Sequence, residues 1–272
     1  MRLINRHPGR AARLFLGSLP FLILVVAYLV ASAARLADNP GDKLLPALSS
    51  FAQAIETMAL TPDRRTGAYL LWSDTWASLT RLWAGLGIAT AITLVMGLAI
   101  GVLPVMRALL APVVAFASMV PPLALLPILF IALGLGETSK IALIVIGVTP
   151  FLIRDLSLAA AALPREMIVK AETLSASTWL IALRVVLPQV MPRLLDSLRL
   201  QLGPAFLFLI AAEAISADSG LGYRIFLVRR YLSMDIIFPY VAWITLLAVA
   251  MDLGLGGLRR LMFPWWGLEG RR

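Results

Sequence analysis

Three long runs without a charged residue constrain this chain more than any other feature. The runs cover residues 14–34, 82–106 and 108–136. A helix that crosses a lipid bilayer needs ~20 mostly apolar residues, and an uncharged run of about 18 or more is a candidate span. Only 14% of the 272 residues are charged, whereas soluble domains are roughly a quarter charged. The sequence therefore predicts a helical membrane protein.

Three further apolar segments are interrupted by charge. Residues 141–163 contain Arg154 and Asp155, residues 200–213 end at Glu213, and residues 236–252 end at Asp252. We expect six spans, at about residues 14–36, 82–104, 109–133, 139–161, 196–216 and 237–258. No polar stretch is long enough for a separate soluble domain, so we expect one all-α membrane domain over residues 1–272.

The basic residues gather on one side of this arrangement. With the N-terminus inside and six alternating spans, 15 of the 24 Lys and Arg residues fall inside, together with six of the 15 acidic residues. The outside then holds nine of each. Because an excess of Lys and Arg marks the cytoplasmic side, we expect both termini to be cytoplasmic. The formal charge of +9 reflects this topology and indicates no nucleic-acid partner.

The rare residue types exclude several classes of chemistry. The chain has no cysteine, and its one histidine, His7, lies in the basic N-terminal tail. Disulfides, thiolate metal sites and cysteine nucleophiles are therefore excluded. We expect no catalytic residue, no metal and no cofactor, and an intramembrane enzyme is disfavoured.

The N-terminal region has some features of a signal peptide. Arg-rich residues 1–13 precede an apolar run, and small residues follow at 31–33. The apolar run is longer than that of a typical signal peptide. We expect an uncleaved first span.

Residues 38–80 combine turn-forming residues with a short amphipathic segment at residues 48–60. We place this stretch outside the membrane, on the face opposite the basic loops. Two interpretations stay open, a solvated linker and a docking surface for an extracytoplasmic partner.

The third predicted span contains four prolines, Pro112, Pro121, Pro122 and Pro127. Proline removes an intrahelical hydrogen bond and bends the helix, and in lipid only protein or water can satisfy the freed carbonyl groups. We expect this span to be buried in the helix bundle, either as a kinked packing helix or as a helix that lines a pathway. Pro121 and Pro122 are the candidate pathway or gating residues.

Small residues recur in the second span at Gly85, Gly87, Ala91, Gly97 and Gly101. Such residues allow another helix to approach closely. The pattern predicts helix packing and says nothing about a substrate.

The most informative polar segment covers residues 164–199, on the basic side between the fourth and fifth spans. Residues 165–174 predict a short amphipathic helix, and Ser177 is a natural N-cap for a second helix at residues 178–187, closed by Pro188. We expect a helix-turn-helix on the cytoplasmic side. The alternative is a helix that lies on the membrane surface.

This segment resembles the cytoplasmic EAA loop of ABC importer permeases. The family pattern is Glu-Ala-Ala, three residues, Gly, nine residues, Ile, one residue and Leu-Pro. The matching positions are Ala171 for the second alanine, Ser175 for the glycine, Val185 for the isoleucine, and Leu187 and Pro188 for the Leu-Pro. Val169 stands where the family has glutamate, and Lys170 replaces the first alanine.

Flanking segments resemble the taurine, alkanesulfonate and nitrate branch of that family. Residues 121–127 and 134–140 resemble its junction between the third and fourth spans. Further along the chain the expected order is kept by Glu213, residues 219–223 (Ser-Gly-Leu-Gly-Tyr), Asp252 and Trp265. The resemblance covers about residues 70–266.

The resemblance implies a permease subunit of an ABC importer in the bacterial inner membrane, working by alternating access on a small solute, often an anion such as a sulfonate or nitrate. It implies three partners: an ABC ATPase subunit, an extracytoplasmic solute-binding protein and a second permease copy, as a homodimer. It also implies that an ATPase subunit receives a coupling helix whose residues include Ala171, Leu174, Ser175, Val185, Leu187 and Pro188.

The chain itself offers no phosphate-binding loop, because the pattern Gly-x-x-x-x-Gly-Lys-Ser/Thr does not occur in it. ATP hydrolysis would therefore need another chain. A secondary transporter or channel without an ATPase partner remains the alternative, and inverted repeats would favour it. We find no convincing internal repeat.

Two acidic residues lie toward the ends of the last two spans, Glu213 and Asp252. Ionisable groups in a membrane are costly and often functional. One interpretation is a structural role, either as a pair with Arg199, Arg224 or Arg259 or as a carboxylate that reaches an interface, and the other is a direct pathway or gating role.

Overall fold

The computed structural model describes residues 9–64 and 66–267. Every regular element in these ranges is a helix. The long elements are α1 (Arg10–Asp38), α3 (Leu70–Val102), α6 (Glu137–Ala161), α9 (Leu187–Ser216) and α11 (Met234–Met262). The shorter ones are α2 (Leu48–Ile55), α4 (Pro104–Ala117), α5 (Leu126–Leu133), α7 (Arg165–Thr173), α8 (Thr178–Ile181) and α10 (Leu221–Arg229).

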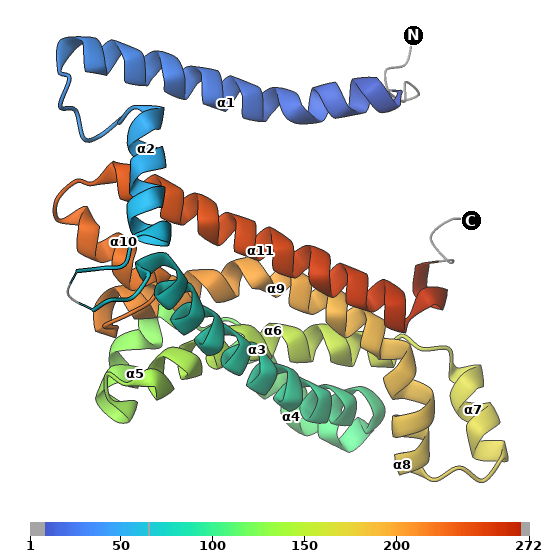
Figure 1. Ribbon diagram of the computed structural model, residues 1–272. Coiled ribbons are helices and arrows are strands. Elements are labelled where there is room, and N and C mark those ends of the chain that lie inside the picture. The colour runs from blue at the N-terminus through green and yellow to red at the C-terminus, as the bar shows by residue number, and fades with distance from the viewer. Residues whose placement is uncertain (1–8, 65, 268–272) are drawn as a thin grey trace.

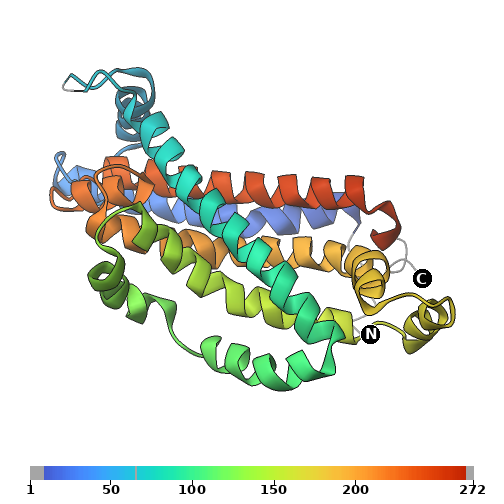
Figure 2. The ribbon, with the colours of Figure 1, turned by 90° about the horizontal axis from the view of Figure 1, so that it is seen from below.

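Six membrane crossings account for this arrangement. Five helices are long and apolar enough to cross a membrane: α1, α3, α6, α11 and the continuous helix Thr178–Ser216 that contains α8 and α9. The views in Figures 1 and 2 place the end of α3 and the start of α6 at opposite ends of the bundle, so the chain between them, α4 and α5, must cross as well. The prediction of an all-α protein with about six spans is confirmed.

The two ends of the bundle carry different elements. The α7 end holds α7, α8, the start of α1 and the end of α11, whereas the α10 end holds α2, α5 and α10 (Figures 1 and 2). An even number of crossings brings both described chain ends to the same side, as expected. Four arginines that we assigned to the inner side lie outside the described residues: Arg2, Arg6, Arg271 and Arg272.

The core of the bundle forms where α3, α6 and α9 pack together. Helices α3 and α6 run parallel, and glycines on α3 face larger side chains on α6. A Cβ atom would lie 2.7 Å from Ile144 at Gly85, 2.9 Å from Leu156 at Gly97 and 2.5 Å from Ala160 at Gly101. Only glycine allows this close approach, which confirms the packing role predicted for these positions. Gly87 differs, because a Cβ there would meet nothing within 4 Å.

Two spans are longer than the sequence predicts. Helix α3 begins at Leu70, about a dozen residues before the expected start, and carries the buried Asp74 and Arg81 within it. The helix that contains the fifth span begins at Thr178, whereas the span itself was expected from about residue 196. Charge ended the predicted apolar runs, whereas the helices continue, and Asp74, Arg81 and Arg193 have partners on neighbouring helices.

The amphipathic segment predicted at residues 48–60 is confirmed. Helix α2 and a following π-helical turn, Glu56–Leu60, cover these residues. Trp72 of α3 donates a hydrogen bond to the carbonyl oxygen of Ala59 at 3.1 Å, which holds the turn against the bundle.

The third span is broken. Helices α4 and α5 meet at 82°, and the break contains Pro121 and a short 3-10 turn, Pro122–Leu125. Consecutive prolines remove the backbone donors that would carry the helix through this point. We expected this span to be buried in the bundle, and for the single chain this is wrong: only Val114 and Leu126 are buried in α4 and α5.

Helix α1 stands apart from the core (Figure 1). Its apolar central window has no buried residue. Its attachments lie near its C-terminal half, where Tyr28 donates a hydrogen bond to the carbonyl oxygen of Pro46 at 2.6 Å and its ring contacts Phe51 and Phe238, each with centroids 5.9 Å away. Most apolar side chains of α1 are therefore exposed on the single chain.

Candidate functional site

Helix α7 ends in a compact backbone motif. The amide of Ala176 donates to the carbonyl oxygen of Ala171 at 3.1 Å, and the amide of Ser175 donates to that of Glu172 at 2.9 Å. This pair of bonds is the Schellman motif, which usually places glycine at the position of Ser175. Ser175 has a φ of 57°, in the left-handed region that costs a residue with a Cβ atom. Ser175 is the position at which the family pattern has glycine, the residue that best tolerates this left-handed conformation.

The second helix starts as the sequence predicts. Ser177 is the N-cap of α8, and its side-chain oxygen accepts a hydrogen bond from the amide of Leu180 at 3.3 Å. The predicted helix-turn-helix is present, with α7 within one residue of its expected bounds.

Pro188 does not close this helix, so that expectation is wrong. A π-helical turn, Ala182–Val186, leads directly into α9, where Pro188 occupies the first turn. The amide of Leu187 donates to the carbonyl oxygen of Ala182, five residues back. A π-helical turn directly precedes Pro188, whose ring and missing amide would disrupt a regular α-helix, and the chain continues into α9 without a break.

The segment turns some apolar side chains outward. Leu174 is 83% exposed and Trp179 is 73% exposed. In contrast, Ala171 and Val185 pack against the core cluster. The candidate residues therefore divide into an inward set, which holds the helix pair on the bundle, and an outward set available to a partner. Leu187 is half-buried, and Ser175 and Pro188 are exposed.

The Ser175 conformation leads to a prediction. Ser175→Gly should stabilise the chain by roughly 0.5–1 kcal/mol, because glycine adopts a positive φ without the Cβ penalty. We expect the heat-unfolding midpoint in detergent to rise by about 1–4 °C. Ser177→Ala, which removes the N-cap, should lower it instead. A lower midpoint for Ser175→Gly than for the unchanged chain would contradict the left-handed geometry.

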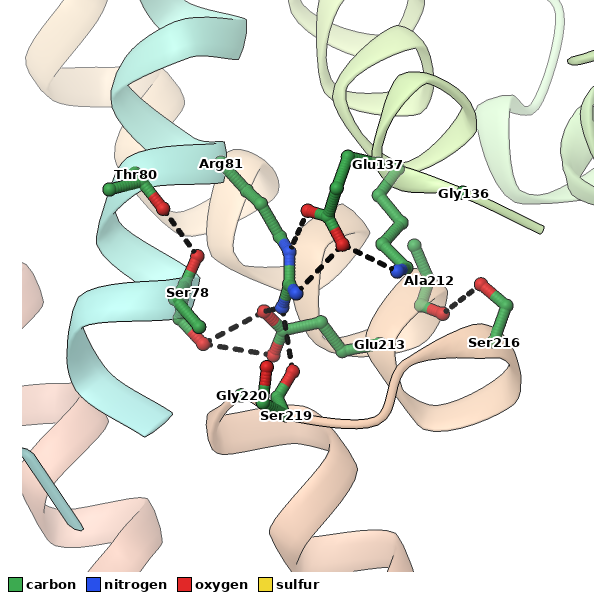
Figure 3. Close-up of polar contacts among 12 residues, drawn as sticks. Ser78, Thr80, Arg81, Gly136, Glu137, Ala212, Glu213, Ser216, Ser219 and Gly220 are labelled. Carbon is green, nitrogen blue, oxygen red and sulfur yellow. Dashed lines mark hydrogen bonds and ion pairs between the residues drawn. The ribbon is translucent and has the colours of Figure 1, made fainter. Parts of the chain in front are cut away.

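Glu213 lies at the centre of a buried ion cluster at the α10 end (Figure 3). Its side chain is fully buried. Arg81 Nη1 of α3 donates to Glu213 Oε1 at 2.7 Å, the amide of Gly222 donates to Oε2 at 2.9 Å, and Ser78 Oγ lies 2.8 Å from Oε1. The carboxylate therefore connects α3, α9 and α10.

Arg81 extends the cluster to α6. Its Nη2 donates to Glu137 Oε1 at 2.9 Å, its Nε also donates to Glu137, and its Nη1 reaches the carbonyl oxygen of Ser219 at 2.7 Å. Lys140 Nζ donates to Glu137 Oε1 at 2.9 Å. Two cations and two carboxylates thus neutralise one another; Glu213, Arg81 and Lys140 are buried, whereas the Glu137 side chain is 57% exposed at the edge of the cluster.

The N-terminus of α10 is capped by side chains from α3 and α9. The amide of Gly220 donates to Asp74 Oδ1 at 3.0 Å, and that of Leu221 donates to Ser78 Oγ at 2.8 Å. Carboxylates at a helix N-terminus complement its exposed amides and its dipole. Gly220 has a φ of 129°, and a Cβ there would lie 2.5 Å from the Glu213 carboxyl carbon. Glycine at this position lets the turn close over Glu213.

The partner of Glu213 was missed from the sequence. We weighed Arg199, Arg224 and Arg259, but Arg224 pairs with Asp74 at 2.8 Å and the partner of Glu213 is Arg81. The sequence feature that pointed to Arg81 as a membrane-side cation is its position, because it directly precedes the second uncharged run.

Asp252 lies far from Glu213, in the half of α11 nearer the α7 end. Arg199 of α9 donates to both of its carboxylate oxygens at 2.8 Å, the bidentate arrangement that favours Arg-carboxylate pairs. Arg259 forms a second link to α9 through Asp196. These pairs hold α9 and α11 together.

Large parts of this chain match a known protein family and known proteins. Residues 91–266 match the family described as "Binding-protein-dependent transport system inner membrane component". The chain is 35% identical over 197 residues to the taurine transport system permease protein TauC of Escherichia coli K12, with 72% of each chain covered. It is 31% identical over 252 residues to the bicarbonate transport system permease protein CmpB of Synechococcus elongatus, covering 90% of this chain and 86% of that protein.

A shorter match links the chain to the putative aliphatic sulfonates transport permease protein SsuC of Escherichia coli K12, at 30% identity over 146 residues, which is 54% of this chain and 56% of that protein. A solved structure, described as inward-facing conformations of the MetNI methionine ABC transporter, contains a chain of the same fold. The TM-score is 0.61 at 19% identity, covering 69% of this chain and 93% of that one.

Proposed function

The chain belongs to the binding-protein-dependent transport system inner membrane components and is the membrane-spanning permease of an ABC importer; from this premise we propose that it passes a small anionic solute inward, driven by an ABC ATPase that binds the α7 end. A separate subunit would hydrolyse the ATP. The secondary transporter or channel that the sequence left open is not favoured by this family.

The observation that carries the ATPase proposal is the outward apolar surface of α7 and α8. Leu174 and Trp179 expose large apolar side chains on a helix pair that lies beyond the ends of the spans. Exposed apolar groups outside the lipid mark sites of protein contact. We infer that Leu174 enters a groove of the ATPase, while Ala171 and Val185 fix the pair to the core, so that movement in the ATPase reaches α9 through the unbroken helix Thr178–Ser216.

We infer that the α7 end faces the cytoplasm of a bacterial cell. The described basic residues near this end include Arg10, Arg13, Arg165 and Lys170. A surplus of Lys and Arg on one side orients membrane proteins with that side inward. The ends of the chain would then both be cytoplasmic, in a multi-pass inner-membrane protein.

Two surfaces that are exposed on the single chain support a second permease copy. The break near Met119, which is 76% exposed, leaves irregular backbone uncovered on the single chain. Lipid cannot satisfy such backbone, so protein or a water-filled cavity must cover it. Most of α1 is likewise uncovered. A homodimer that encloses a pathway would cover both.

The α10 end supports an extracytoplasmic solute-binding protein as partner. A polar cavity of ≈ 690 Å³ lies between the α1–α2 loop and the turn before α11, with Lys43, Ser50 and Asp235 among its lining residues. Asp42 pairs with Arg35 beside it, and this hydrogen bond lowers the pKa of Asp42 below its usual value. Of the two interpretations of residues 38–80, we favour the docking surface.

The solute class comes from the relatives. Taurine, aliphatic sulfonates and bicarbonate are the solutes that their names give, and each of these solutes carries an anionic oxygen-rich group. We therefore propose a sulfonate-like or similar small anion for this chain.

A reconstituted transport assay tests this function. The chain is purified with its ATPase subunit, placed in liposomes with its solute-binding protein, and offered labelled taurine, ethanesulfonate and bicarbonate as probes. We expect uptake of at least one probe that stops when ATP is replaced by a non-hydrolysable analogue. Uptake that continues at the same rate without hydrolysis would overturn the proposal in favour of a secondary transporter.

A further inference from the structure

Arg154 is a cation without a carboxylate partner inside the spanning part of α6. Among the described residues its side chain makes one bond, from Nη1 to Ser118 Oγ at 2.8 Å, and no acid pairs with it. The adjacent acid, Asp155, is occupied on another face of α6 by Arg193 at 2.7 Å and by Ser197. A charge at this depth is costly unless it has a partner or contacts water.

The direction of the Arg154 side chain excludes simple anchoring at the near interface. Arg154 lies seven residues before the end of α6, about 10 Å from that end at 1.5 Å per residue. Ile153 packs against Val114, and Ser118 follows Val114 by one turn, about 6 Å further toward the α10 end. The guanidinium therefore points away from the cytoplasmic interface and into the membrane, whereas an anchoring arginine extends toward the interface.

The Arg154 side chain ends beside the break in the third span. Ser118, its partner, is the C-cap of α4, directly before the irregular residues that lead to Pro121. Exposed irregular backbone at membrane depth needs protein or water. The exposed Arg154 and the exposed break in the third span thus lie close together, where a second chain or water would cover both.

Arg154 also lines a cavity of ≈ 200 Å³ between α4 and α6, whose other lining residues lie on the α7 side of Ser118. Its walls are mostly apolar, from Ile100, Val114, Ile153 and Leu158, and Arg154 is its charged residue. This combination suits a small organic anion, because the guanidinium can bind a sulfonate or carboxylate through paired N–H donors while the walls contact the carbon part.

We propose that Arg154, held by Ser118, is an anion-contacting residue of the solute pathway, and that the α4–α6 cavity lined by Arg154 forms the rest of this contact site. The proposal rests on the proposed function, since it names the residue that would meet the anion. Arg154 also gives the pathway a positive potential near its cytoplasmic part, which concentrates anions and repels cations.

The absence of cysteine from the chain allows a direct test. Ala115→Cys places a reporter thiol in the cavity wall, and the complex with ATPase and binding protein is treated in nanodiscs with two methanethiosulfonates, one carrying a sulfonate and the other a trimethylammonium group. We expect the anionic reagent to react faster than the cationic one, by roughly fivefold, the size expected for one unit charge several ångströms away in water.

Two further variants assign this preference to Arg154. Adding Arg154→Gln should abolish it, and adding Arg154→Lys should keep most of it. Arg260→Gln is the matched control, because Arg260 is exposed on the same side of the bundle and has no partner among the described residues; it should leave the preference unchanged. An unreactive Ala115→Cys thiol, or a preference that survives Arg154→Gln, would overturn the proposal.

Uptake measured on the same preparation separates this inference from the proposed function. Arg154→Gln should slow ATP-driven uptake of the transported anion at least tenfold while Arg260→Gln does not. ATP-driven uptake together with no reagent preference would overturn the Arg154 site alone. A preference that depends on Arg154, in a complex whose uptake needs no hydrolysis, would support the site and overturn the proposed ATP coupling.

Discussion

Replacing Glu213 with leucine should destabilise the chain by about 3–5 kcal/mol, the usual cost of removing one partner of a buried ion pair. The change removes the acceptor of three side-chain and backbone donors, from Arg81, Ser78 and Gly222. It leaves the Arg81 guanidinium buried with only Glu137 to balance it. We expect the α10 end to loosen, because α3, α9 and α10 meet at this carboxylate.

The measurement is heat-induced unfolding of the purified chain in detergent, followed by the fluorescence of its tryptophans. Asp218→Asn is the matched control, since Asp218 is an exposed acid only five residues away. The double variant Arg81→Met with Glu213→Leu should be more stable than Glu213→Leu alone, because it leaves no unbalanced cation. If Glu213→Leu unfolds at the same temperature as Asp218→Asn, the cluster does not stabilise the fold.

This prediction also bears on gating. Every oxygen of Glu213 is occupied by a donor, and the side chain is fully buried. We therefore propose a structural role for Glu213 and, through its bidentate pair with Arg199, for Asp252. Pro121 and Pro122 remain our gating candidates, because they form the break at which α5 can move relative to α4.

The second large effect is expected at Leu174. Leu174→Asp should weaken association with the ATPase subunit roughly 30-fold or more and abolish ATP-driven uptake. Burial of a leucine side chain is worth about 2 kcal/mol, which is close to 30-fold in a dissociation constant. A carboxylate forced into an apolar groove adds a further penalty.

Co-purification of the tagged ATPase subunit with each variant measures this effect. Because Leu174 is 83% exposed, the substitution should leave the heat stability of the chain unchanged. Leu174→Met, which keeps the apolar volume, should bind the ATPase as the unchanged chain does. Ala171→Asp would be a poor probe, because Ala171 packs on the core and its replacement disturbs folding as well. Full association of Leu174→Asp would remove Leu174 from the interface.

Much of this architecture can be predicted from the sequence because lipid imposes simple rules. Apolar length predicts the spans, and local chemistry predicts the helix-turn-helix: Ser177 has the side chain that caps α8, and the helix that begins at Arg165 ends where a left-handed residue is required. These features depend on neighbours within a few residues.

The features that were missed depend on distant residues. Arg81 was placed at the edge of a span because a single sequence does not reveal that Glu137 and Glu213 neutralise it across 56 and 132 residues. Pro188 indicated a helix end, but the π-helical turn before it keeps the helix continuous. The exposure of α4 and α5 was not predicted. A broken span can be buried by a second chain instead of by its own, and the sequence of one chain does not distinguish the two cases.

ATP-driven transport by this chain requires that residues 165–188 face the cytoplasm and contact the ATPase, and thiol labelling tests this most directly. A Leu174→Cys variant has a single cysteine, because the natural chain has none. We predict that a membrane-impermeant maleimide labels it in inverted vesicles stripped of the ATPase, that bound ATPase protects it, and that intact spheroplasts show no labelling. Labelling from the outer face of intact spheroplasts would place the segment beyond reach of any cytoplasmic ATPase and contradict the account.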